Sequence, residues 1–217
     1  MVRPFDAVLF DLDGTLIDSV GLILESHRHT LDAFGMPAKT DEELIEGMGT
    51  PLEAQYRLWA DDPADVPRMV AAYIAHNLEI HDDYVTAYPG VVAEIRALTA
   101  AGVPLGVVTS KRREGTTRGL RLVGLDDAFE VLVCADDVER PKPHPEPVER
   151  ALEALGGVAP ERALFIGDSP HDMEAGRGAR VATAAALWGP FGREPLVPSE
   201  PSHWLEAPPA IRPLWTG

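Results

Sequence analysis

Five short apolar segments, separated by helical patterns, constrain the fold of this chain more than any other feature. Each segment is continuously apolar, which is typical of strands that are buried on both faces. The stretches between them carry helix signals, such as the prolines that open 145–155 and the glycine that follows 91–101. Alternating strands and helices predict an α/β fold with a Rossmann-like, mostly parallel sheet. The predicted strands are 7–10, 103–108, 131–134, 163–166 and 181–187.

The chain departs from this alternation between its first and second predicted strands. Only helical signals occur there, including Thr40 and Thr50 in patterns that fit capping boxes. A crossover between parallel strands needs one helix, whereas this segment holds about four. The proline-rich tail after Gly189 is expected to wrap the core without forming a large element. We predict a core domain of residues 1–17 and 86–217, with a small α-helical cap domain, residues 18–85, inserted after the first strand.

The charge of the chain limits its partners. Of its 217 residues, 35 are acidic and 19 are basic, which gives a formal net charge of −16. This balance argues against nucleic acid and against an anionic membrane, because both require a basic surface. A small anionic substrate is compatible with it where a local basic cluster or a metal ion overcomes the overall charge. No signal peptide or apolar span is visible, so a cytoplasmic monomer or homodimer is expected.

Two carboxylates follow the first predicted strand directly. They are Asp11 and Asp13, and Gly14 then allows the chain to turn sharply. Carboxylates two residues apart point the same way along an extended chain, and their repulsion favours a bound cation or a shared proton. Taken alone, however, this pattern is also common in acidic turns.

The strand predicted at 163–166 has a similar ending. It leads into Gly167 and Asp168, and a second carboxylate, Asp172, follows four residues later. A helix cap would explain Asp168 by itself. Because ligands of open parallel sheets collect beyond the carboxyl ends of the strands, Asp168 is predicted to lie near the acids of the first strand.

The two remaining strand ends carry a hydroxyl group and a lysine. Thr109 and Ser110 follow the strand at 103–108, where a hydroxyl with neighbouring backbone amides can bind a phosphate oxygen. Lys142 follows the strand at 131–134 and lies between two prolines that stiffen its loop. Each signal is weak alone, yet together they predict one site with acids for a metal, a hydroxyl for phosphate and a fixed positive charge.

These four motifs, in this order, resemble those of the haloacid dehalogenase superfamily of phosphohydrolases, and the resemblance covers essentially the whole chain. It implies that Asp11 attacks phosphorus and becomes an aspartyl phosphate, while Asp13 acts as the general acid and base. It also implies a Mg²⁺ site at Asp11, Asp13 and Asp168, with the backbone carbonyl of Asp13 as a ligand. The implied phosphate ligands are Thr109, Ser110, Lys111 and Lys142, and Asp172 is implied to position Lys142 or the metal's waters.

Within this superfamily, the chain is most similar to the phosphoglycolate phosphatase-like subfamily, including its inorganic pyrophosphatase branch. Its stretches 136–139 and 142–148 carry the pyrophosphatase resemblance. The segment 47–52, with Thr50, resembles the loop through which the cap contacts substrate and closes over the site. The orientation of three other cap residues stays open, and in the fourth motif an exposed position is expected for His171. Those cap residues are His27, His29 and Arg57.

Four alternatives to a phosphatase are weighed. Dehalogenases lack the second acid, so Asp13 argues against carbon–halogen cleavage. Sugar-phosphate mutases of the same architecture usually carry a histidine about twelve residues after the nucleophile, where this chain has Ile23. A phospho-receiver domain combines similar residues, but it is far shorter and has no helical insert. A non-catalytic binding protein on the same fold is also compatible with the sequence.

Overall fold

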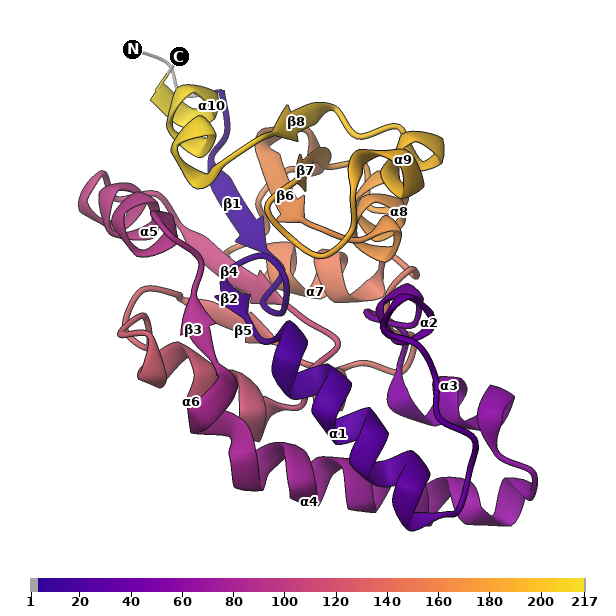
Figure 1. The fold of residues 1–217 in the computed structure, drawn as a ribbon. Helices are drawn as coiled ribbons and strands as arrows, with labels where there is room; N and C mark the ends of the chain where they lie inside the picture. The colour runs from indigo at the N-terminus through magenta and orange to yellow at the C-terminus, as the bar shows by residue number, and fades with distance from the viewer. Residues whose placement is uncertain (1–3, 217) are drawn as a thin grey trace.

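The computed structural model describes residues 4–216 and contains a parallel six-stranded sheet (Figure 1). Its strand order is β5-β4-β1-β6-β7-β8, so the first strand of the chain lies in the middle of the sheet. This confirms the predicted α/β class with a parallel sheet. The strands are β1 (Ala7–Phe10), β4 (Leu105–Val108), β5 (Val131–Val133), β6 (Ala163–Gly167), β7 (Ala182–Ala186) and β8 (His203–Leu205).

The central strand β1 pairs with β4 on one side and β6 on the other. Leu9 lies opposite Gly106 in β4 and opposite Phe165 in β6. All four residues of β1 are buried, which is why the sequence of this strand is continuously apolar. The pairing brings the carboxyl ends of these three strands to one edge of the sheet.

Helices cover both faces of the sheet. One face packs against α5 (Val91–Ala100), α6 (Arg113–Leu122) and the segment around Ile211, near α10 (Arg212–Thr216). The other face packs against α7 (Glu146–Ala154) and α8 (Pro170–Gly178). Successive side chains of β1 alternate between these layers, since Val8 and Phe10 belong to the first and Leu9 to the second. A short helix, α9 (Arg193–Leu196), extends the second layer through Leu196, which packs with Met173 of α8.

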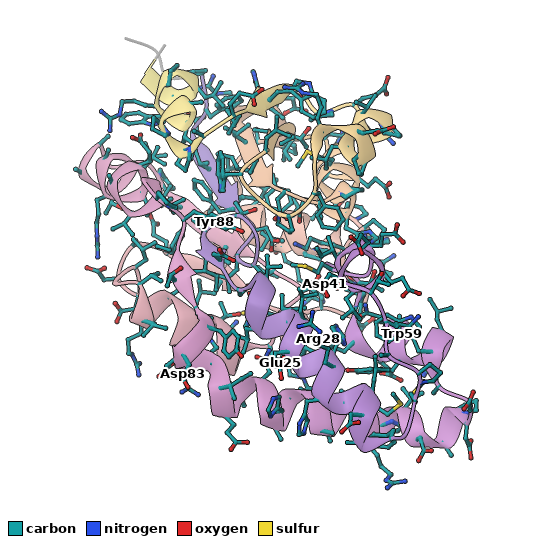
Figure 2. All side chains as sticks on the ribbon, viewed as in Figure 1. Glu25, Arg28, Asp41, Trp59, Asp83 and Tyr88 are labelled. Atoms are coloured by element: carbon teal, nitrogen blue, oxygen red, sulfur yellow. The ribbon has the colours of Figure 1, made fainter. Side chains whose placement is uncertain are left out.

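Four α-helices lie between β1 and α5, in the segment where the sequence predicts a helical insert, and they have an apolar cluster of their own. The long helices α1 and α4 run side by side, and α2 and α3 pack at one end of them (Figure 1). Arg28 on α1 pairs with Asp41 at the start of α2, and Trp59 closes the cluster at the end of α3 (Figure 2). These helices are α1 (Val20–Ala33), α2 (Asp41–Glu46), α3 (Leu52–Trp59) and α4 (Val66–Tyr84).

Three details differ from the sequence prediction. The tail forms a sixth strand, β8, that pairs with β7, so it completes the sheet as well as wrapping the core. The two ends of the helical segment are joined by a short antiparallel pair, β2 (Ile17–Asp18) with β3 (Thr86–Ala87). Thr40 forms a capping box, but Thr50 does not, because Pro51 is the N-cap of α3 and the Thr50 hydroxyl is directed elsewhere. None of the helices within residues 4–216 is long and apolar enough to span a membrane.

Candidate active site

The carboxyl ends of β1, β4 and β6 bring the predicted site residues together. Asp11 follows β1 directly, Thr109 follows β4, and Asp168 follows β6. The backbone fixes these ends, because the Asp11 amide donates to the Ile166 carbonyl and the Thr109 amide donates to the Val133 carbonyl, both at 2.9 Å. All three side chains are buried. Three motifs that are separate in the sequence thus meet at one edge of the sheet.

Lys142 is the charged centre of this group. Its ammonium lies 2.9 Å from Asp11 Oδ1 and 2.6 Å from Asp172 Oδ1, and it also donates to the Val108 carbonyl at 3.2 Å. Only 2% of the Lys142 side chain is exposed. A buried ammonium with these partners cannot move freely, so the site holds one positive charge at a fixed place. The contact with Asp172 corresponds to one of the two roles predicted for that residue, the positioning of Lys142.

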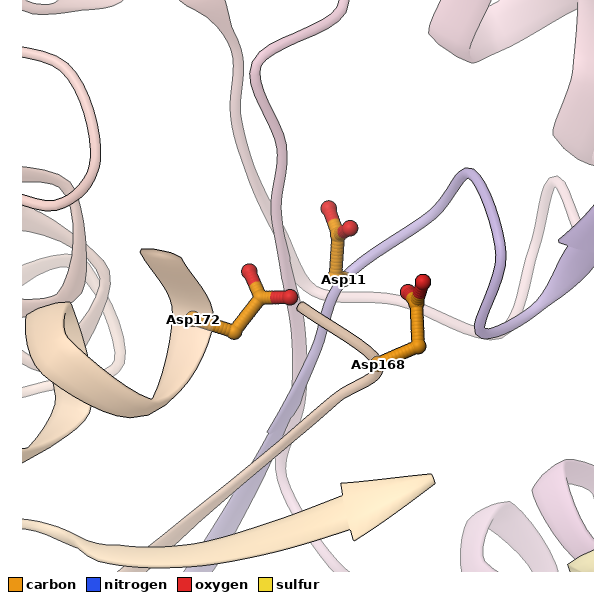
Figure 3. A group of neighbouring side chains, drawn as sticks. All are labelled: Asp11, Asp168 and Asp172. Atoms are coloured by element: carbon orange, nitrogen blue, oxygen red, sulfur yellow. The ribbon is translucent and has the colours of Figure 1, made fainter. Parts of the chain in front are cut away.

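Asp168 is held from its own side of the group. The Thr15 hydroxyl donates to Asp168 Oδ1 at 2.8 Å. Gly14 has φ +87°, and a Cβ atom there would lie 2.4 Å from Asp168 Oδ2. Glycine is therefore required at position 14 by both the turn and the close approach of the carboxylate. Figure 3 shows how Asp11, Asp168 and Asp172 gather their carboxylates in one place.

Burial and mutual repulsion raise the proton affinity of these acids. The pKa of Asp11 is raised to about 7, first because of burial and then because of Asp172, although Lys142 acts in the opposite direction. Burial, with Asp172 and Asp11, also raises the pKa of Asp168 well above its ordinary value. Burial opposes the charge of Lys142, but Asp11 and Asp172 outweigh it and raise the lysine pKa. The group therefore has more negative charge than its one lysine can neutralise.

The excess charge and the donor atoms fit a divalent metal ion. Asp11, Asp168 and Asp172 each offer a carboxylate oxygen, and these oxygens lie within 4.8 Å of one another. Oxygen donors of this kind suit hard cations, and a divalent cation would offset the repulsion that raises the two pKa values. The metal ligands predicted from the sequence included Asp13 and not Asp172. The Asp13 side chain instead contacts Ser19 and Lys111.

Asp13 lies at the rim of the group. Its Oδ1 accepts hydrogen bonds from the Ser19 hydroxyl at 2.6 Å and from the Lys111 ammonium at 2.9 Å. The Lys111 side chain passes close to Gly115, where a Cβ atom would lie 2.8 Å from Lys111 Cε. The two contacts orient the Asp13 carboxylate at the wall of the cavity described next.

A cavity of about 440 Å³ separates the strand ends from the helical segment. Asp11, Asp13, Lys142 and Asp168 line it on the core side. The segment 47–52 closes another side, where the Gly49 carbonyl accepts a hydrogen bond from the Ser110 hydroxyl at 3.0 Å. The cavity can therefore hold a ligand whose reacting group contacts the core while the remainder contacts the cap helices.

Thr50 and Ser110 each form a hydrogen bond between the cap segment and the core, with partners that the sequence did not indicate. The Thr50 hydroxyl lies 3.2 Å from Nε2 of His171, which belongs to α8 of the core. His171 is partly buried, and burial lowers its pKa, so the expectation of an exposed position is wrong. The Thr50 hydroxyl of the cap segment thus contacts the core, and the Ser110 hydroxyl of the core contacts the cap segment. Neither contact involves a substrate, so the role of these two residues in substrate binding stays a prediction.

The remaining cap candidates separate into buried and exposed residues. His27 is buried among rings, 3.0 Å from the Tyr56 hydroxyl, and burial lowers its pKa to about 4. It also lines the cavity. His29 stacks on His76 at the surface, and Arg57 pairs with Glu53 one helical turn away in solvent. Of the three, only His27 lies where it could influence a bound ligand.

Sequence reasoning missed three supporting contacts. They are the Ser19 hydroxyl on Asp13, the Ser169 hydroxyl that donates to Asp172 at 2.7 Å, and the Trp188 indole that donates to the Thr15 carbonyl at 2.9 Å. Ser169 could have been found, because Ser169 and Asp172 have capping-box spacing. Trp188 comes from the far end of β7, and no local pattern points to it.

Comparisons with known proteins agree on one family. The family described as "Haloacid dehalogenase-like hydrolase" matches residues 8–186. "Pyrophosphatase PpaX" of Anoxybacillus flavithermus is 41% identical over 201 residues, which are 93% of this chain and 92% of that protein. The protein of the same name from Halalkalibacterium halodurans is 39% identical over 95% of this chain and 94% of its own length. A putative phosphoglycolate phosphatase from Lactobacillus plantarum has a similar crystal structure, with a TM-score of 0.88, 28% identity and coverage of 97% and 99% of the two chains.

Proposed function

The chain belongs to the haloacid dehalogenase-like hydrolase family, and on that basis we propose that it is a Mg²⁺-dependent phosphohydrolase that acts through an aspartyl phosphate on Asp11. The observation that carries the proposal is the buried group around Lys142. An anionic nucleophile at Asp11 must approach an anionic phosphoryl group, which requires positive charge within a few ångströms. Lys142 lies 2.9 Å from Asp11 and would supply part of that charge.

The metal would supply the rest. Asp11 and Asp168, with the backbone carbonyl of Asp13, would hold Mg²⁺, and Asp172 would hold Lys142 in position. When bound, the ion would offset charge between the nucleophile and the phosphoryl oxygens. It would also favour the ionised form of Asp11, whose pKa is about 7 in the metal-free protein.

The reaction would proceed in two displacements. The Asp11 carboxylate attacks phosphorus, the bond from phosphorus to the leaving oxygen breaks, and Asp13 donates a proton to that oxygen. Asp13, now ionised, then takes a proton from water, whose oxygen attacks the aspartyl phosphate and releases inorganic phosphate. Thr109 and Lys111, with Lys142, would bind phosphoryl oxygens in both steps, and Ser19 and Lys111 would hold Asp13 in place.

Inorganic pyrophosphate is the substrate best supported by the relatives. Two relatives named as pyrophosphatases match more than nine tenths of this chain at about 40% identity. A phosphoglycolate-type phosphomonoester is the second candidate, which the less similar structural relative supports. Both are small and strongly anionic, as the partner prediction requires.

Phosphate release tests the proposal. Purified protein would be assayed with pyrophosphate, phosphoglycolate, sugar phosphates and nucleotides, with Mg²⁺ and with excess chelator. We expect release from at least one small substrate with Mg²⁺ and none with chelator, restored when Mg²⁺ is added back. Equal release in chelator would contradict the metal requirement. Absence of release from every substrate by folded protein would contradict the phosphohydrolase itself.

A further inference from the structure

We propose that the enzyme also hydrolyses phosphomonoesters whose leaving group is uncharged and apolar, and that the cap helices bind this group. The inference rests on the proposed phosphohydrolase function and adds a substrate class to it. It starts from the cavity wall opposite Asp11. Three residues of α4 at four-residue spacing, Val70, Ile74 and Leu78, line that wall and therefore share one face of the helix.

The neighbouring helix completes this wall. Ile23 of α1 lines the same cavity, and α1 runs beside α4 (Figure 1). Ile23 and Leu78 are partly exposed, and neither belongs to the apolar clusters found in the described part of the chain. When a ligand covers an apolar side chain that lines a cavity but is left out of the core, burial of that side chain is favourable. We call Ile23, Val70, Ile74 and Leu78 the apolar wall.

The charges around the cavity favour an uncharged leaving group. Six acidic and three basic side chains line it. Each basic side chain already has a carboxylate partner: Lys142 pairs with Asp11 and Asp172, Lys111 pairs with Asp13 at 2.9 Å, and Arg112 lies 3.7 Å from Asp136. A second anionic group must compete for these cations, whereas an alkyl or aryl group needs none.

The size of the cavity agrees with such a ligand. A volume of about 440 Å³ lies within the range of ~300–1,000 Å³ that encloses organic ligands. A phosphoryl group at Asp11 would fill only the core side, which leaves the space against the apolar wall for the leaving group. The reaction balances as before: the phosphorus–oxygen ester bond breaks, the alcohol leaves with a proton from Asp13, and water supplies the new oxygen of phosphate.

A homologous series of substrates tests the proposal. Linear alkyl phosphates from methyl to hexyl have leaving groups of nearly constant basicity, so kcat/KM across the series reports on burial of the chain. We expect kcat/KM to rise about two- to fourfold for each methylene that reaches the wall. Pyrophosphate and phosphoglycolate are assayed beside them. A flat series with active pyrophosphate hydrolysis would overturn this inference alone, while inactivity on every substrate would overturn the proposed function and the inference together.

Matched variants locate the binding surface. Leu78→Asn should reduce the hexyl-to-methyl ratio of kcat/KM at least fivefold, and a ratio within one variant is insensitive to general loss of activity. Leu58→Asn is the control, because Leu58 is 82% exposed on α3 and does not line the cavity. An equal change in both variants would overturn the assignment to the apolar wall.

Alkylphosphonates give a measurement that requires neither hydrolysis of an alkyl phosphate nor a variant of the enzyme. Because they are not hydrolysed, their inhibition of pyrophosphate hydrolysis by the unmodified enzyme reports binding directly. The inhibition constant should fall two- to fourfold per methylene from methyl- to hexylphosphonate. Equal inhibition across the series would overturn the proposal.

Discussion

The two sides of the cavity are built in opposite ways. On the core side, Asp11, Lys142, Asp168 and Asp172 are ionisable and almost fully buried, and ion pairs join Lys142 with Asp11 and Asp172. On the cap side, helices α1 and α4 present mostly apolar side chains, together with the polar Asn77 and with the neutral His27 among aromatic rings. In the proposed function, the core side would act on the phosphoryl group, and the cap side would contact the leaving group. Chemistry and substrate choice would then be carried by separate parts of one cavity.

The two sides should also respond oppositely to pH. The pKa of Asp11 is raised to about 7 and that of His27 is lowered to about 4, in both cases chiefly by burial. A buried acid resists losing its proton and a buried imidazole resists gaining one. Each pKa shift therefore favours the uncharged form of its side chain. The resulting dependence of protein stability on pH has opposite signs, because stability is lost as pH rises for Asp11 and as pH falls for His27.

The largest effect should come from the nucleophile. Asp11→Asn removes the attacking carboxylate and should lower kcat by ~10⁴-fold or more, with an unchanged circular dichroism spectrum. Asp83→Asn, a change of the same kind on the exposed side of α4 (Figure 2), should leave kcat within twofold. Substantial phosphate release by Asp11→Asn would contradict the covalent intermediate.

Loss of the buried lysine should affect both activity and stability. Lys142→Met leaves two buried carboxylates, Asp11 and Asp172, without their cation, so kcat should fall ~10²–10³-fold and the free energy of unfolding by ~3–5 kcal/mol. Steady-state kinetics and urea unfolding measure the two effects. Lys39→Met breaks a surface pair with Glu43 on the cap and should cost no more than ~1 kcal/mol. An equal loss of unfolding free energy in the two variants would contradict the expected difference between the buried ion pairs of the core and the surface pair of the cap.

Replacing Asp11 should stabilise the metal-free protein at neutral and higher pH. Between about pH 4 and 7 the unfolded chain ionises this residue while the folded chain keeps it protonated, so stability is lost as pH rises through that window. Asp11→Asn lacks this loss and should be more stable than the original protein by ~1–3 kcal/mol at pH 8. Urea unfolding in chelator at several pH values tests this, and a less stable variant at pH 8 would contradict it.

His27 should contribute the opposite dependence. The unfolded chain gains a proton at this residue below about pH 6.5, whereas the folded chain resists protonation down to about pH 4, so stability is lost as pH falls. His27→Gln should reduce the loss of unfolding free energy between pH 6.5 and 4 by ~1–3 kcal/mol. His29→Gln, at the exposed stacked ring, serves as the control, and an equal reduction there would assign the effect to surface charge.

The smallest effect should lie at the boundary between the two sides. Ser110→Ala removes the hydrogen bond to the Gly49 carbonyl and should raise KM ~2- to 10-fold with little change in kcat, because one neutral hydrogen bond that closes the cavity is lost. Ser202→Ala, beside β8 at the edge of the sheet, should change neither constant. A larger fall in kcat than rise in KM would instead place Ser110 on the phosphoryl group.

The sequence by itself determined the parallel sheet and the chemistry at its strand ends. Continuous apolar runs reveal buried strands, and Asp11 and Asp168 follow their strands directly, so chain order alone puts them at one edge. Tertiary structure decided what lies around them. The Ser110–Gly49 and Thr50–His171 contacts, the β7–β8 pairing and the apolar wall of α1 and α4 join residues from different elements. Such contacts depend on how helices and strands pack in three dimensions, and local periodicity carries no record of that packing.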